Sequence, residues 1–118
     1  ISTGLMVHRA LEVADSLKSY SINAKVIDVF RLKPINIGAI KVAIVKSKKI
    51  ITIEEHSING GLGSIIAEML ADLAINIPLK RLAIEDKFLC AYGVRENLHR
   101  ERGLDTESIV EFIIKWLQ

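Results

Sequence analysis

Three polar residues, Glu54, Glu55 and His56, follow a run of β-branched residues and precede a glycine-rich turn. Two carboxylates beside a histidine could act in general acid–base catalysis. Neighbouring residues of a strand point to opposite faces, so both carboxylates could face one substrate only if the strand had already ended. His56 could hydrogen-bond to either carboxylate. We favour the alternative, a hydrogen-bonded loop that orders the turn or contacts another domain.

The turn Gly60-Gly61-Leu62-Gly63-Ser64 could instead bind a phosphate, because free backbone N–H groups at a helix start attract anions. It matches neither strict phosphate-binding template. No lysine follows the glycines as a P-loop requires, and Ile66 stands where a dinucleotide-binding turn needs a small residue. The two preceding carboxylates would also oppose a phosphate. We therefore expect these glycines to permit a tight turn and close backbone packing, with nucleotide binding as the alternative.

The other reactive side chains stand alone in the sequence. His8 and His99 have no partner at the spacing of a helical metal site. Ser57 and Ser64 lack the flanking sequence of a nucleophilic serine. The single cysteine, Cys90, lies among apolar residues, so a packed thiol is expected. The sequence thus predicts no self-sufficient catalytic set and no metal site.

Composition favours one compact domain over residues 1–118, since 50% of the residues are hydrophobic and only 5% are aromatic. The net charge of +2 comes from interspersed charges, which argues against a nucleic-acid partner. The basic cluster Lys46–Lys49 is expected to be a solvated helix end. No apolar run could span a membrane. A single cysteine fits a reducing, cytoplasmic location.

Strand and helix patterns alternate along the chain. Strands are predicted near Ile1, Val26, Ile51 and Leu82, the second of them running from Ala24 to Phe30. Helices are predicted over residues 5–19, 62–75, 94–102 and 106–117, together with one that Asn36 caps and that runs through Val45; Asp105 caps the last. This order predicts a three-layer α/β domain with a mainly parallel sheet. A fifth strand could lie upstream of Ile1, if the chain is a piece of a longer one.

Two helices should bury one apolar face each. The expected inward residues of the helix over 62–75 are Ile65, Ile66, Met69, Leu70 and Leu73. Those of the last helix are Ile109, Val110, Ile113, Ile114 and Leu117. Trp116 is expected to seal this helix against the core or a partner.

Several motifs, in order and spacing, resemble the C-terminal domain of the transketolase family over essentially the whole chain. They are Ile1-Ser2-Thr3-Gly4, Val26-Ile27-Asp28-Val29, Lys33-Pro34-Ile35-Asn36, Thr52 to Ser64, Pro78-Leu79-Lys80-Arg81, Asp86-x-Phe88, Tyr92-Gly93-x-Arg95-x-x-Leu98-His99 and Gly103-Leu104-Asp105. The motif beginning at Tyr92 looks closest to transketolase-like proteins encoded as separate halves. Deoxyxylulose-phosphate synthase and the β subunits of 2-oxo acid dehydrogenases share the domain more distantly.

The resemblance implies a three-layer α/β/α fold with a mixed five-stranded sheet whose first strand is antiparallel. It implies a homodimeric enzyme that uses thiamine diphosphate and magnesium to move two-carbon ketol units between sugars. In this family the cofactor and substrate contacts lie mainly on the other domains, so no catalytic, cofactor-binding or metal-binding residue is expected here. The implied role is packing on the remaining transketolase domains or subunit. The candidate interdomain or dimer loop consists of Glu54, Glu55, His56, Asn59, Gly60, Gly61 and Gly63.

Overall fold

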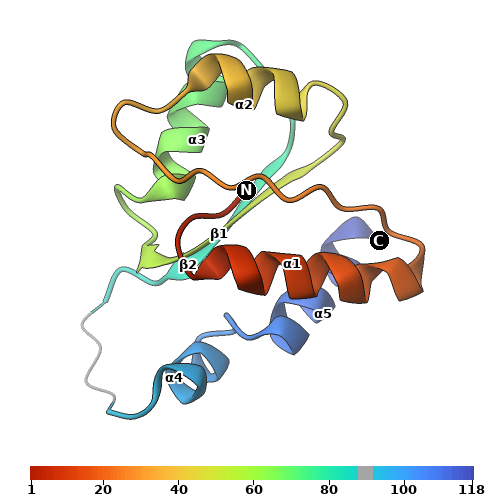
Figure 1. The fold of residues 1–118 in the computed structure, drawn as a ribbon, viewed down its shortest axis with the longest axis vertical. Helices are drawn as coiled ribbons and strands as arrows, with labels where there is room; N and C mark the ends of the chain where they lie inside the picture. The colour runs from red at the N-terminus through yellow and green to blue at the C-terminus, as the bar shows by residue number, and fades with distance from the viewer. Residues whose placement is uncertain (88–91) are drawn as a thin grey trace.

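The computed structural model describes residues 1–87 and 92–118 of the chain (Figure 1). The helices are α1 (Met6–Leu17), continued by the 3-10 turn η1 (Lys18–Tyr20), α2 (Ile37–Ile44), α3 (Leu62–Asp72), α4 (Arg95–Glu101) and α5 (Thr106–Leu117). The strands are β1 (Ile50–Ser57) and β2 (Leu79–Ile84). Cys90, expected to be a packed thiol, lies outside the described residues.

The sheet is parallel throughout the described residues. β1 pairs with β2 in parallel, and Ser2 forms parallel bridges to Asp28 on one side and to Ile53 on the other. The order across the sheet is therefore the Asp28 segment, the Ser2 segment, β1 and β2. The prediction of four parallel segments is confirmed in position, but only two of them form full strands. The segment over residues 24–30, predicted as a strand, forms only the isolated bridge at Asp28 among the described residues, and Phe30 at its end is 84% exposed.

Helices cover both faces of this sheet and give the three-layer α/β/α arrangement that the sequence predicts (Figure 1). α1 and α5 form one core with Ile53, while α2 and α3 form the other with Ile50. The alternation of side chains along β1 explains this division, because odd-numbered residues face α1 and α5 and even-numbered residues face α3. The same alternation places the side chains of Glu54 and Glu55 on opposite faces of the sheet, with Glu54 toward α3.

The predicted helix starts at Asn36 and Asp105 are confirmed. The Asn36 side chain accepts a hydrogen bond from the N–H of Ala39 at 3.0 Å, and Asp105 accepts one from the N–H of Ser108 at 3.1 Å. Such caps satisfy N–H groups that have no partner inside the helix.

The predicted end of α3 and two predicted inward residues need correction. α3 ends at Asp72 rather than residue 75, because Ala74 takes a left-handed conformation with φ +51°. Leu73 is therefore 38% exposed, and Leu117 at the end of α5 is 39% exposed. Ile65 and Ile114 are only partly buried, whereas the remaining predicted inward residues of these two helices are buried.

The end of α5 is held by a lysine from the basic cluster. Lys49 donates to the backbone oxygen of Trp116 at 2.9 Å, and its ammonium lies 4.7 Å from the centre of the indole ring. Lys46 and Lys48 are exposed as expected, but Lys49 is partly buried by this contact. The cation–π contact therefore helps Trp116 to attach α5 to the start of β1.

Candidate interaction loop at the carboxyl end of β1

Glu54 is a fully buried carboxylate that caps α3 from a distance along the chain. Its Oε2 accepts a hydrogen bond from the N–H of Leu62 and its Oε1 accepts one from the N–H of Gly63, both at 2.7 Å. The N-cap residue of α3, Gly61, has no side chain to do this. Glu54 thus supplies both the acceptors and the negative charge that a helix N-terminus favours.

This arrangement removes the phosphate site considered from the sequence. An anion at the start of α3 would need the N–H groups that Glu54 already occupies. The N–H of Gly60 is also used, because it donates to the hydroxyl of Ser64 at 3.0 Å. The glycine-rich turn therefore binds the protein's own carboxylate, and the nucleotide-binding alternative has no geometric support.

Each glycine of the turn has a structural reason. A Cβ on Gly61 would lie 2.1 Å from Oε2 of Glu54, and a Cβ on Gly63 would lie 2.8 Å from the hydroxyl of Thr52. Gly60 has φ +79°, a conformation that favours glycine. The expected tight turn and close packing are therefore present. The group that packs closely against Gly61 is the buried carboxylate of Glu54.

Side-chain hydrogen bonds stabilise the rest of the loop, and His56 remains exposed at its surface. Asn59 donates from its amide to Asp86 at 2.8 Å, and Arg81 donates to the backbone oxygen of Ile58 at 3.0 Å. His56 lies with its Nδ1 3.6 Å from Oε2 of Glu54, and 58% of its side chain is exposed. His56 and Asn59 therefore form the outer surface of an internally ordered loop.

Glu55 lies on the opposite face of the sheet and belongs to a different cluster. Its Oε2 lies 3.2 Å from Nε2 of His99 and 3.4 Å from Nε of Arg95, both on α4. The strand continues to Ser57, so Glu54 and Glu55 point to opposite faces of the sheet. As expected from the sequence, they cannot act on one substrate. His99, which stands alone in the sequence, is 7% exposed and paired with Glu55. No sequence spacing could have revealed this pair.

No catalytic or metal-binding set emerges from residues 1–87 and 92–118. Both oxygens of Glu54 are occupied by backbone donors, so it is not available as a base. No group of three or more histidine, cysteine, aspartate or glutamate side chains in this part of the chain could hold a metal ion. None of the helices there is long and apolar enough to cross a membrane.

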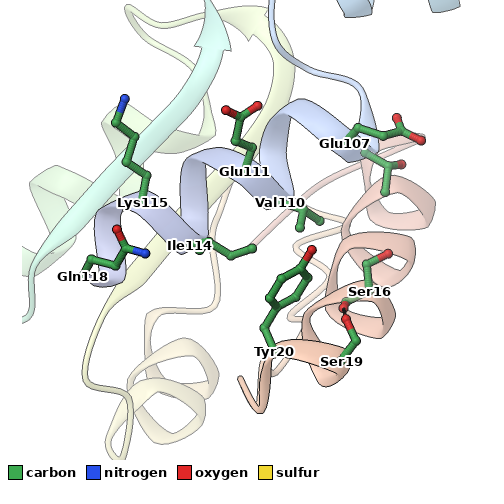
Figure 2. A pocket seen from close by; sticks show the side chains of 10 residues that line it. Ser16, Ser19, Tyr20, Glu107, Val110, Glu111, Ile114, Lys115 and Gln118 are labelled. Carbon is green, nitrogen blue, oxygen red and sulfur yellow. Dashed lines mark hydrogen bonds between the residues drawn. The ribbon is translucent and has the colours of Figure 1, made fainter.

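A groove of about 550 Å³ lies between α1 and α5, away from this loop (Figure 2). Figure 2 shows the ring of Tyr20 between the two helices, with Val110 and Ile114 beside it and Glu111 pointing away. Its polar side chains do not converge on one point. We therefore assign it no chemistry.

Comparison with known proteins identifies the family. The family model of the transketolase C-terminal domain matches residues 1–109. The chain belongs to this family. One subunit of the apulose-4-phosphate transketolase of Actinobacillus succinogenes is 33% identical over 97% of the chain, and the 1-deoxy-D-xylulose-5-phosphate synthase of Chlorobium luteolum is 36% identical over 93%.

A solved structure supports the same assignment for the fold. A split-gene transketolase described as an inactive β4 tetramer has a TM-score of 0.85 and 32% identity over 97% of the chain. The chain covers 37% of that protein, 37% of the Actinobacillus protein and 17% of the Chlorobium synthase. It therefore corresponds to one part of each of these longer proteins.

Proposed function

We propose that residues 1–118 form the C-terminal domain of a longer transketolase-type enzyme that moves two-carbon ketol units between sugars. The observation that carries this proposal is the match to the transketolase C-terminal domain over residues 1–109. The domain alone is inactive and serves assembly. The internally satisfied loop supports this role, because its carboxylates hold α3 and α4 instead of facing a substrate.

The contact surface for the rest of the enzyme includes His56 and Asn59. Glu54, Gly60, Gly61 and Gly63 do not touch a partner in this proposal; they hold the turn in shape beneath these two side chains. Glu55 fixes α4 on the other face. The partners are the remaining transketolase domains or subunit, in an enzyme that forms a homodimer in a cytoplasmic location.

Thiamine diphosphate and magnesium belong to the complete enzyme in this proposal. The described residues do not fit either group, because no cluster of metal ligands forms among them and the N–H groups at the start of α3 are occupied by Glu54. We therefore assign no cofactor contact to the residues that the structure describes. What it contributes is a rigid surface at the carboxyl end of the sheet.

One experiment tests the assembly role in the complete enzyme. His56→Ala is expected to weaken assembly, measured by analytical ultracentrifugation, more than it lowers ketol transfer per assembled enzyme. Lys18→Ala is a matched control, because Lys18 is an exposed side chain outside the loop. Loss of ketol transfer with assembly and thiamine diphosphate affinity intact would refute the assembly role. Clear turnover by the isolated 118-residue chain with both cofactors would refute its inactivity.

A second candidate is the C-terminal domain of a 1-deoxy-D-xylulose-5-phosphate synthase, which the 36% identity to the Chlorobium enzyme favours. The β subunit of a 2-oxo acid dehydrogenase is a more distant alternative. Assaying the complete enzyme for ketol transfer and for formation of 1-deoxy-D-xylulose 5-phosphate separates the first two. The residues preceding Ile1 in the longer chain would distinguish all three.

A further inference from the structure

A cavity of about 320 Å³ lies between the ends of β1 and β2 and α4. Ile84, Leu98 and Leu104 give it an apolar wall. Among the described residues, its polar wall consists of Glu55, Arg95, His99 and Arg102. At about 30 Å³ for each water molecule, it has room for about ten non-hydrogen atoms. This volume is at the lower end of the range of small-molecule sites.

The cations of this cavity retain donors that the described protein groups do not use. Within the described part of the chain, Arg95 has one polar contact, from its Nε to Glu55. The guanidinium of Arg102 makes no hydrogen bond or ion pair within residues 1–87 and 92–118. Nearby, Glu85 has its pKa lowered by Lys87 first and by Arg102 to a smaller degree, so Lys87 already compensates that carboxylate. The arginines therefore present N–H groups at the cavity that residues 1–87 and 92–118 do not use.

The histidine in this wall is buried close to Glu55. Nε2 of His99 faces Glu55 at 3.2 Å, whereas Nδ1 has no hydrogen-bond partner in the described structure. A buried polar atom without a partner is uncommon in native proteins and calls for an explanation. Glu55 lies beside the buried ring, so the cavity wall joins side chains of β1 and α4.

We propose that this cavity binds a small organic anion. Its phosphate or carboxylate group contacts the guanidinium groups of Arg95 and Arg102, and its apolar part packs on Leu98. Guanidinium groups suit both anions because they offer paired, planar donors. Glu55 limits the excess positive charge and keeps His99 in place. This ligand site lies on the α4 face and does not depend on the ketol-transfer role.

The test is an NMR titration of the isotopically labelled 118-residue chain with inorganic phosphate and, separately, with butyrate. Ionic strength is held constant with sodium chloride. Saturable shifts are expected at the amides of Gly93, Leu98 and Arg102 at millimolar concentrations of at least one anion. Arg102→Gln should weaken binding about tenfold, the effect of losing one charged contact. Arg100→Gln, an exposed arginine on the same helix that does not line the cavity, should leave it unchanged.

Saturation by phosphate or by butyrate supports the site and identifies the preferred head group. Shifts that stay linear for both anions overturn the proposal, and so does equal affinity in Arg102→Gln and the natural chain. If Arg102→Gln disturbs the resonances of α5 and so the fold, Arg95→Gln provides the same comparison. Unchanged affinity in that variant also overturns the proposal.

Discussion

Glu54 and Glu55 are adjacent in β1, yet their carboxylates lie on opposite faces of the sheet and in different surroundings. The Glu54 side chain is fully buried and receives two backbone N–H groups at 2.7 Å. The Glu55 side chain is 26% exposed, and its Oε2 lies 3.2 Å from Nε2 of His99 and 3.4 Å from Nε of Arg95. One carboxylate closes a helix end, and the other borders a cavity.

The comparison shows how burial and hydrogen bonding together decide the role of a charge. A buried carboxylate is costly unless donors replace its water, and charge-assisted bonds from a helix N-terminus do this well. Glu54 has such donors and has no free oxygen for chemistry. Glu55 keeps contact with solvent and with long side chains, so its surroundings can accept a ligand. Position in the sequence alone would not separate the two.

The largest predicted effect comes from Glu54→Gln. The new amide group would place an NH₂ against a backbone N–H, and the negative charge at the start of α3 would be lost. We expect a loss of about 3 kcal/mol in the free energy of unfolding. For a domain of this size, thermal unfolding would shift down by roughly 10 °C. Chemical denaturation followed by circular dichroism measures the change.

Glu55→Gln is the matched control for this prediction. Its ion pair with Arg95 is partly exposed, and such pairs contribute about 1 kcal/mol or less. The adjacent position, the same chemistry and the same strand make the comparison direct. If both substitutions lower the free energy of unfolding equally, the difference drawn between the buried carboxylate of Glu54 and the partly exposed carboxylate of Glu55 is wrong.

The next prediction concerns the glycine that lets Glu54 approach α3. Gly61→Ala would place a Cβ 2.1 Å from Oε2 of Glu54 and 2.9 Å from the backbone oxygen of Ser57. We expect a loss of about 2 kcal/mol, because the backbone and a hydrogen-bonded carboxylate must both shift. The free energy of unfolding at neutral pH is the measurement.

Gly38→Ala is the control within the same chain. The nearest atom to its added Cβ is Oδ1 of Asn36 at 3.7 Å, and Gly38 lies in α2. This change should stabilise the protein by about 0.5–1 kcal/mol, since alanine is the better helix former. The double variant Glu54→Gln with Gly61→Ala should cost less than the sum of its parts, because both changes damage one cap. Additive costs would contradict that shared origin.

Much of the fold could be predicted from the sequence because it depends on local patterns. The helix caps at Asn36 and Asp105 and the strand near Leu82 are each indicated by nearby residues. Predictions failed where tertiary contacts decide. α3 ends because Ala74 takes a left-handed conformation although it is not a glycine, and the segment over residues 24–30 forms a bridge at Asp28 instead of a full strand.

The candidate site could be predicted only in part, because some of its features depend on local backbone geometry and others on tertiary contacts. The turn glycines and the opposite faces of Glu54 and Glu55 follow from backbone geometry, which a sequence can indicate. The pairing of Glu55 with His99 joins residues far apart in the chain, so no spacing rule applies to it. The capping of α3 by Glu54 is also invisible locally, because a helix cap normally comes from the residue at its start.

Apart from the two controls, the smallest predicted effect compares the local cap at Asp105 with the distant cap that Glu54 provides. At Asp105, burial opposes ionisation, but hydrogen bonds from the hydroxyl and N–H of Ser108 outweigh it and hold the pKa below its usual 3.8. Asp105→Ala should therefore cost about 1 kcal/mol at pH 7, clearly less than Glu54→Gln.

The pH dependence of this cost has a definite sign. A lowered pKa in the folded state means that the ionised Asp105 stabilises the protein above pH 3.8 and loses this contribution as the pH falls through the folded-state pKa. Urea denaturation of the natural chain and of Asp105→Asn at about pH 7 and about pH 2.5 measures it. The asparagine still caps but cannot ionise, so the advantage of aspartate should shrink at the lower pH. An advantage that is equal at both values would show that Ser108 stabilises the side chain by its shape and hydrogen bonds and not by its charge.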